Sequence, residues 1–243
     1  VMERAAVEGR VLELVAPRLS VDVPDWRIHT RELIAYPLLP GEPGLELDAT
    51  GGPVWRVDAS SPGYSLSLGE LLAELHGVEI SDAAATGATV QTPEQVRRAW
   101  RADIEKVSQE FTVAGHLLER WAAWLDEDSY WPEHSVFTHG EIYPGHTLIR
   151  DDRITGVLDW TTAAVGDPAR DFVYHLTIAT PGAFRSTVDR YVERGGRVWP
   201  RLAEHCAELA TAFPVTYGLY VLDSGDETQR EAAAAQLNPP AEG

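Results

Sequence analysis

Residues 136–172, VFTHGEIYPGHTLIRDDRITGVLDWTTAAVGDPARDF, constrain the fold of this chain more than any other stretch. Two short apolar runs at 147–149 and 154–158 flank a polar turn, a pattern typical of two antiparallel strands. A polar loop precedes the first run, and Asp159 directly follows the second. The stretch therefore predicts a β-hairpin with a loop before it and a carboxylate at its far end.

Three polar residues of this stretch suit phosphoryl transfer, in which a protein orients a hydroxyl nucleophile and holds magnesium against phosphates. Glu141 can accept the proton of a hydroxyl, His146 can help to hold a metal, and Asp159 can bind the metal directly. The predicted hairpin can bring these side chains together although they lie up to eighteen positions apart. Eukaryotic protein kinases arrange H-R-D-x-x-x-x-N and D-F-G in the same order for the same reasons.

The chain resembles the aminoglycoside phosphotransferase-like kinases in the motif HGE-x-x-x-x-H, followed by GVLDW and VGDPARDF. It is most similar to their macrolide 2'-phosphotransferase branch in HGEIYPGH and VLDWTTAAVGDP. The resemblance implies an α+β, protein-kinase-like fold with a mostly helical C-terminal lobe, an inserted catalytic hairpin and an incomplete N-terminal lobe. Residues 1–40 are then the remnant of a nucleotide lobe and hinge, and residues 41–243 are the helical lobe with the catalytic loop and substrate site.

For the site, the resemblance implies that Glu141 accepts or orients the hydroxyl proton and that Asp159 binds Mg²⁺. It further implies that His146 assists the metal shell and that His139 holds the loop by hydrogen bonds. The family usually has Asp at the place of Glu141, whose extra methylene moves the carboxylate by roughly 1.5 Å but leaves it able to act as a base. Most of the wider family has Asn at the place of His146, and the macrolide branch has His. Because Mg²⁺ prefers harder ligands than imidazole, direct ligation and contact through a metal-bound water both stay open.

Residues 1–16 predict a helix on which either Glu8 or Glu13 is the glutamate that, by the resemblance, pairs with a phosphate-holding lysine. A solvated helix face explains either glutamate equally well. The sequence contains no G-x-G-x-x-G and no V-A-I-K-like run. We therefore expect an N-terminally truncated form of a longer protein, with poor affinity for nucleotide.

Two strand candidates follow, at 27–28 and 33–36, before Pro and Gly residues break the pattern. By the resemblance this is the hinge between two lobes, and GTP is the usual phosphoryl donor. Backbone contacts with the purine are then expected from Tyr36, Pro37, Leu38 and Leu39. Considered alone, the same residues fit an ordinary strand end, and no residue distinguishes guanine from adenine.

The resemblance implies a macrolide antibiotic as substrate, phosphorylated on the 2'-hydroxyl of its desosamine sugar, which confers resistance. The candidate pocket walls, each of which is equally explained as helix core, are Tyr174, His175, Phe213, Tyr217 and Tyr220. Two alternatives stay open. One is a kinase of another small hydroxyl substrate such as an aminoglycoside, and the other is a binding protein without turnover.

Composition limits the partners of the chain. The net charge of −18 over 243 residues argues against nucleic acid and anionic membranes, and it fits either a cationic small molecule or simple solubility. The single Cys206 excludes an internal disulfide and a cysteine-based zinc site. Because no apolar run approaches the length of a transmembrane helix, we expect a cytoplasmic protein, and we expect it to be a monomer.

The first half of the remaining chain contains two further predicted features. Ser67, with Glu70 three residues on, predicts the N-cap of a helix at 68–76, which ends at a structural His76. The small residues at 81–89 predict a linker.

Helical periodicity dominates the second half. A long helical region is expected to begin after Thr92 and to break near Gly115. Asp167 is expected to be the N-cap of another helix, and Asp171 a structural anchor that holds the catalytic loop. Further helices are expected at 183–194, 199–213, 215–222 and 228–237.

Overall fold

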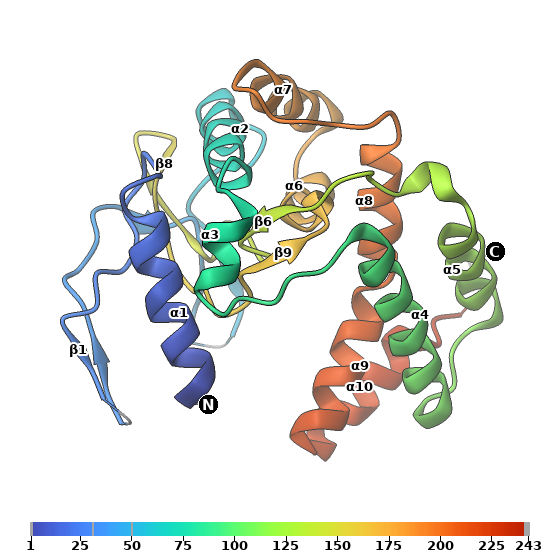
Figure 1. Ribbon diagram of the computed structural model, residues 1–243. Helices are drawn as coiled ribbons and strands as arrows, with labels where there is room; N and C mark the ends of the chain where they lie inside the picture. The colour runs from blue at the N-terminus through green and yellow to red at the C-terminus, as the bar shows by residue number, and fades with distance from the viewer. Residues whose placement is uncertain (1, 31, 50, 241–243) are drawn as a thin grey trace.

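The computed structural model describes residues 2–30, 32–49 and 51–240; Val1, which the sequence places in the first helix, lies outside them. Figure 1 shows α1 and several short strands on one side of the molecule and a group of helices that includes α4, α5, α9 and α10 on the other. Strands β6 and β9 lie between these two parts. The arrangement is of the predicted α+β class.

In chain order the helices are α1 (Met2–Val15), α2 (Pro62–His76), α3 (Ile80–Ala85), α4 (Pro93–Glu110), α5 (Gly115–Asp126), α6 (Val173–Ile178), α7 (Pro181–Glu193), α8 (Leu202–Thr211), α9 (Phe213–Ser224) and α10 (Glu227–Leu237). The short 3₁₀ helices are η1 (Asp128–Tyr130) and η2 (Pro168–Asp171). The strands are β1 (Ile28–His29), β2 (Ile34–Ala35), β3 (Glu42–Pro43), β4 (Leu45–Leu47), β5 (Pro53–Trp55), β6 (Val136–Thr138), β7 (Thr147–Arg150), β8 (Arg153–Val157) and β9 (Ala164–Gly166).

The predicted hairpin is confirmed. Strands β7 and β8 pair antiparallel, with Thr147 opposite Val157, and β3 extends the sheet in the order β3-β7-β8. The turn between them places Asp151 and Asp152 at φ of 50 and 63°. Asp tolerates this left-handed conformation better than most residues, which suits a tight hairpin turn.

A second pair of strands, which the sequence pattern did not predict, closes the segment. Strand β6 leads into the polar loop, and β9 follows Asp159 and pairs antiparallel with β6, with Phe137 opposite Val165. The two ends of residues 136–166 therefore pair with each other, so the polar loop and the hairpin form one closed unit.

Helix α2 begins six residues before its predicted start. Its N-cap is Ser61, whose hydroxyl accepts a hydrogen bond from the Tyr64 amide, and Pro62 occupies the first turn. Ser67 lies buried inside the helix and donates to the Tyr64 carbonyl, so the predicted cap there is wrong. Glu70, the predicted partner of that cap, binds arginines of other elements instead. Both serines precede an apolar run, and the proline after Ser61 identifies the true start.

The predicted linker at 81–89 is also wrong in part, because α3 covers its first residues. Alanine has the highest helix propensity, which explains a helical turn in a run of small residues. The predicted start after Thr92 is confirmed by a capping box, in which Thr92 and Gln95 each bond the backbone of the other. The predicted break is confirmed, since α5 begins at Gly115.

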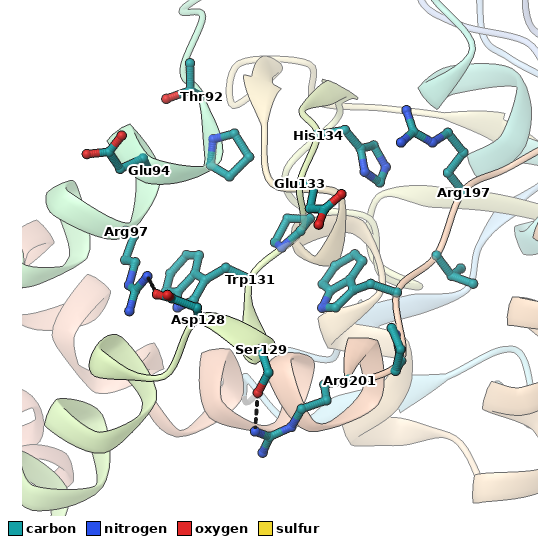
Figure 2. A pocket seen from close by; sticks show the side chains of 15 residues that line it. Thr92, Glu94, Arg97, Asp128, Ser129, Trp131, Glu133, His134, Arg197 and Arg201 are labelled. Carbon is teal, nitrogen blue, oxygen red and sulfur yellow. Dashed lines mark hydrogen bonds and ion pairs between the residues drawn. The ribbon is translucent and has the colours of Figure 1, made fainter.

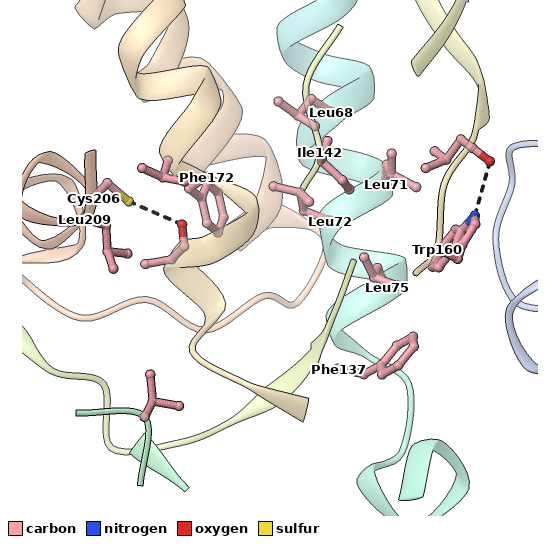
Figure 3. Packing of buried hydrophobic residues seen from close by; sticks show 14 of the residues in the cluster. Leu68, Leu71, Leu72, Leu75, Phe137, Ile142, Trp160, Phe172, Cys206 and Leu209 are labelled. Atoms are coloured by element: carbon pink, nitrogen blue, oxygen red, sulfur yellow. Dashed lines mark hydrogen bonds between the residues drawn. The ribbon is translucent and has the colours of Figure 1, made fainter. Parts of the chain in front are cut away.

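The core is centred on α2, whose leucines Leu68, Leu71, Leu72 and Leu75 are each at most 1% exposed. Figure 3 shows these leucines with Ile142 of the polar loop in the same buried cluster. Burying Ile142 contributes about 1.5–3 kcal/mol and fixes the loop to α2. Within the described ranges, no helix combines the length and apolar character needed to cross a membrane.

Candidate active site

The polar loop between β6 and β7 requires a glycine at its second position. Gly140 has a φ of 87°, and a Cβ there would lie 2.8 Å from the Thr162 carbonyl oxygen. Only glycine adopts this conformation without strain and leaves room for the close approach. The loop can therefore turn sharply directly after β6 and direct Glu141 away from the core.

The carboxylate of Asp171 holds the start of this loop. Its Oδ2 accepts a hydrogen bond from the His139 amide at 3.0 Å, and its Oδ1 accepts one from the Gly140 amide at 2.6 Å. Burial raises the pKa of Asp171, but the hydrogen bonds and nearby histidines outweigh burial and hold its pKa below the ordinary value. The carboxylate is thus ionised, and the expectation that Asp171 anchors the loop is confirmed.

His139 is fully buried, and its two ring nitrogens have different partners. Nε2 lies 3.0 Å from the Leu158 carbonyl oxygen, and Nδ1 accepts the Glu141 amide at 3.3 Å. One neutral tautomer, with the proton on Nε2, satisfies both bonds. Burial lowers the pKa of His139 to about 4, so the ring is neutral at pH 7 and links the loop to the end of β8.

His146 directs its Nε2 at Asp159. Its Nδ1 lies 3.1 Å from the Glu141 carbonyl oxygen and donates a hydrogen bond to it. Nε2 lies 3.7 Å from Asp159 Oδ2. This separation is longer than a direct hydrogen bond, and it allows both atoms to approach a shared cation.

Asp159 has a φ of 59°, which is unusual for a residue other than glycine. Its Oδ1 accepts hydrogen bonds from the Thr161 hydroxyl at 2.5 Å and the Thr161 amide at 3.3 Å. Partial burial raises the pKa of Asp159, but these bonds and the two histidines outweigh it, so the pKa lies below its ordinary value. The carboxylate is ionised, and its Oδ2 is free of the threonine.

The described residues contain no cluster of three or more His, Cys, Asp or Glu side chains suited to a metal. At the site, Asp159 and His146 are a facing pair of side chains that could hold a metal. The Asp159 carboxylate fits Mg²⁺, which is commonly bound by one or two carboxylates and completes its shell with water and substrate phosphates, and His146 could meet it directly or through a bound water.

Glu141 is half-buried, and its carboxylate makes no hydrogen bond or ion pair within the described ranges. Its charge acts on two neighbouring tyrosines, since burial first and then Glu141 raise the pKa of both Tyr143 and Tyr174. The carboxylate thus lies beside an aromatic wall and is free to accept a proton from a ligand.

A cavity of about 280 Å³ adjoins the loop at Gly140. Two of the five predicted substrate residues, Tyr174 and Phe213, line it, and their rings stack at 5.1 Å. The sequence pattern did not assign Trp100, Asp103 and Arg170 to the site, although they also line the cavity. In the sequence, Trp100 stands four residues from both Val96 and Ile104, and this helical period was the available signal.

The other three predicted substrate residues lie elsewhere. His175 is 2% exposed and hydrogen-bonded to the Thr187 hydroxyl at 2.9 Å. Tyr217 donates to Gln229 of α10, and Tyr220 is 55% exposed on α9. None of the three lines the cavity beside Gly140.

On the opposite side of the hairpin, α1 brings Glu8 to Asp159. Burial raises the pKa of Glu8, a backbone hydrogen bond from Trp160 lowers it, and the charge of Asp159 raises it further. Glu13 is exposed, and it lines a separate hollow. Of the two predicted glutamates, only Glu8 therefore reaches the site.

The predicted hinge residues lie between β2 and β3. Tyr36 is 42% exposed and Leu38 is 99% exposed, whereas Leu39 is partly covered. Their surfaces are accessible to a ligand.

A larger hollow of about 1020 Å³ lies at the end of β6 that is remote from the loop (Figure 2). Two of its cations are already engaged, Arg97 with Asp128 at 2.5 Å and Arg201 with the Ser129 hydroxyl at 2.9 Å. It includes none of the residues around Asp159. The candidate site for phosphoryl transfer is therefore the smaller cavity with the loop and hairpin.

Comparison with known proteins agrees with a site for phosphoryl transfer. The model of the phosphotransferase enzyme family matches residues 1–205. YcbJ of Bacillus subtilis (strain 168), described as an uncharacterized protein, is 40% identical over 241 residues, which are 98% of this chain and 79% of YcbJ.

Two solved structures are similar over nearly the whole chain. Macrolide 2'-phosphotransferase MphH from Brachybacterium faecium has 57% identity and a TM-score of 0.94, over 100% of this chain and 82% of that one. A type I macrolide 2'-phosphotransferase has 42% identity and a TM-score of 0.91, over 98% of this chain and 80% of that one. An aminoglycoside 2'-phosphotransferase in complex with GDP has 18% identity and a TM-score of 0.71, over 97% of this chain and 81% of that one. At this identity the similarity shows only that the two proteins share a fold.

Proposed function

The chain belongs to the phosphotransferase enzyme family and has its protein-kinase-like fold. From this premise we propose that it transfers the γ-phosphate of GTP to the 2'-hydroxyl of the desosamine sugar of macrolide antibiotics, and that this reaction confers resistance. The similarity over the whole chain to two macrolide 2'-phosphotransferases supports the choice of substrate.

One observation carries the proposal. His146 Nε2 and the ionised carboxylate of Asp159 face each other at 3.7 Å, while the carboxylate of Glu141 makes no hydrogen bond or ion pair within the described ranges. A kinase needs both groups, a ligand pair for magnesium and an acceptor for the nucleophile's proton. A protein that only binds a ligand has no use for this combination.

In the proposed reaction, Glu141 orients the hydroxyl and accepts its proton as the new phosphorus–oxygen bond forms. The bond from the γ-phosphorus to the β–γ bridging oxygen breaks, and GDP leaves. Asp159 would hold Mg²⁺ with help from His146, and the metal would supply charge neutralisation at the phosphates. Buried His139 stays neutral and fixes the loop to the end of β8. Because the transition state of phosphoryl transfer is loose, Glu141 acts mainly through positioning.

Residues 1–40 provide the nucleotide side of this site, and residues 41–243 provide the catalytic loop and the substrate side. Glu8 supports the division, because α1 brings its carboxylate next to the Trp160 backbone and Asp159. The exposed backbone segment of the hinge meets the purine through Tyr36, Pro37, Leu38 and Leu39.

The macrolide lies against the aromatic wall beside Glu141. Tyr174 and Phe213 supply stacked rings, and Trp100 lines the same cavity. Asp103 adds a half-buried carboxylate, whose pKa is raised by burial and lowered by Lys106, with a net upward shift. Apolar rings next to a carboxylate suit a ligand that combines an apolar body with a cationic amine.

The test compares two Asp→Asn changes on the same hairpin. Asp159→Asn removes the charge that holds Mg²⁺, and we expect kcat with GTP and erythromycin to fall by more than about 100-fold while the thermal midpoint stays unchanged. Asp151→Asn is the matched control, because Asp151 has a similar left-handed backbone but lies exposed in the turn. Normal turnover in the Asp159 variant would remove that residue from the mechanism.

A further inference from the structure

A line of buried hydrogen bonds connects α7 to the catalytic loop. The hydroxyl of Tyr191 lies 3.0 Å from His76 Nδ1, and His76 Nε2 lies 3.1 Å from Asp171 Oδ2. Asp171 in turn accepts the amides of His139 and Gly140. Helix α2 contributes His76, α7 contributes Tyr191, η2 contributes Asp171, and the loop contributes His139.

The direction of each bond follows from the ionisation of its ends. Ionised Asp171 can only accept, so His76 Nε2 donates to it. Burial raises the pKa of Tyr191 to about 12, so its hydroxyl keeps its proton and can donate to His76 Nδ1. Tyr191 and Asp171 therefore hold the imidazole of His76 at both of its ring nitrogens.

Water cannot replace these contacts. The side chains of His76 and Asp171 are 2% and 0% exposed, and Tyr191 is 1% exposed. Gly196 accommodates the Tyr191 ring, since a Cβ there would collide with it. A buried polar group that loses its hydrogen-bond partner lowers the free energy of unfolding by about 1–3 kcal/mol. Each of these side chains therefore holds its neighbour in position.

We propose that His76 and Tyr191 are positioning residues of phosphoryl transfer. They fix the carboxylate of Asp171, and Asp171 fixes the amides of His139 and Gly140, which directly precede Glu141. In this way they set the direction in which Glu141 meets the hydroxyl of the substrate. Glu141 shares the loop with these amides, and a displacement of about 1 Å at a reacting group can cost up to about 100-fold in rate. This inference rests on the proposed function.

The experiment compares His76→Leu, which removes the donor to Asp171, with His76→Gln, whose amide can still donate. We expect kcat for macrolide phosphorylation to fall about 10- to 100-fold in the leucine variant, with KM changed less than about threefold. The glutamine variant should recover most of kcat. Backbone hydrogen exchange should accelerate at Gly140 in the leucine variant and stay near the wild-type rate in the glutamine variant.

Tyr191→Phe is a milder second variant that keeps the ring and removes only the hydroxyl. We expect a severalfold loss of kcat and faster exchange at Gly140. Tyr130→Phe is its control, because the ring of Tyr130 packs beneath Arg201 and does not line the candidate cavity. Exposed His116→Gln is the control for His76, and both controls should behave as the wild type.

Equal loss of kcat in the leucine and glutamine variants of His76 would overturn the proposal, because packing rather than the hydrogen bond would then explain the loss. Unchanged kcat and unchanged exchange in both His76→Leu and Tyr191→Phe would also overturn it. If the wild-type protein phosphorylates no acceptor, the proposed function fails, and exchange at Gly140 still shows whether His76 and Tyr191 hold the loop.

Discussion

Asp159 adopts a left-handed backbone conformation, which costs roughly 1–3 kcal/mol for a residue other than glycine or asparagine. Two hydrogen bonds from Thr161 offset part of this cost. The same conformation turns the carboxylate toward His146 at the end of the loop. Backbone strain at a residue that carries charge, beside an imidazole nitrogen at 3.7 Å, is the arrangement expected of a functional site rather than of an ordinary strand end.

Two buried histidines, His139 in the loop and His175 on α6, make stability depend on pH. Burial lowers the pKa of both His139 and His175 to about 4, against about 6.5 in an unfolded chain. Below pH 6.5 the unfolded chain binds protons that the folded chain does not bind until about pH 4. The free energy of unfolding should therefore fall as pH decreases through this window, by about 1.4 kcal/mol per pH unit for each histidine.

Urea unfolding at pH 7 and pH 5 measures this effect, with an expected loss of about 4 kcal/mol from the two residues together. His175→Gln, which is remote from the loop, should remove about half of the loss. Carboxylates with lowered pKa, such as Asp171, lose their contribution only at more acidic pH, whereas Glu8 and Asp103, whose pKa values are raised by burial, act in the opposite direction. The difference between the wild type and His175→Gln therefore isolates the histidine contribution. Equal stability at pH 7 and pH 5 would contradict the burial of neutral rings.

Individual residues were predictable where one segment contains them. Glu141, His146 and Asp159 lie in one segment, so the predicted hairpin indicated that their side chains can come together, and His146 and Asp159 face each other at 3.7 Å. The cavity walls were less predictable, because contacts between distant helices form them. A single aromatic residue on a helix does not reveal which neighbour it faces, and His175 faces Thr187 instead of the cavity.

At the scale of elements, the packing of α2 against α7 depends on Gly69. A Cβ there would lie 2.5 Å from the Thr187 carbonyl oxygen and 2.8 Å from Arg190 Cβ. Gly69→Ala should force the helices apart and lower the free energy of unfolding by about 1–3 kcal/mol, despite the higher helix propensity of alanine.

The matched control is Gly182→Ala in the first turn of α7, where a Cβ would meet no atom within 4 Å. Its unfolding free energy should be unchanged or higher by up to about 1 kcal/mol. Chemical denaturation of both variants tests the packing. If both substitutions had the same effect, the close approach of α2 and α7 would be refuted.

Elements with explicit end signals were predicted well, and elements without them were not. Thr92 and its capping box located the start of α4, and the Asp-rich turn located the hairpin. Two serines precede the apolar run of α2, and the pattern selected Ser67 although the chain uses Ser61. Strand β9 is three residues long and has no alternating pattern, so only its pairing with β6 identifies it.

Across the whole molecule, three independent tethers hold the catalytic loop. The β6–β9 pair closes its base, Asp171 binds its first amides, and Ile142 fixes its middle to α2. The motif predicted the fold class because such a loop requires this surrounding framework. It could not predict the tethers beyond Asp171, because β6 and β9 are only three residues long and α2 is distant from Ile142 in the sequence, so neither contact leaves a local pattern.

The measurement that tests the central claim most directly is NMR analysis of erythromycin after incubation with the protein, GTP and Mg²⁺. We predict one new phosphate monoester, with phosphorus coupled to the proton on the 2'-carbon of desosamine. Unmodified erythromycin, together with a phosphorylated aminoglycoside in a parallel reaction, would contradict the proposed substrate and leave the chain a kinase of a different hydroxyl compound.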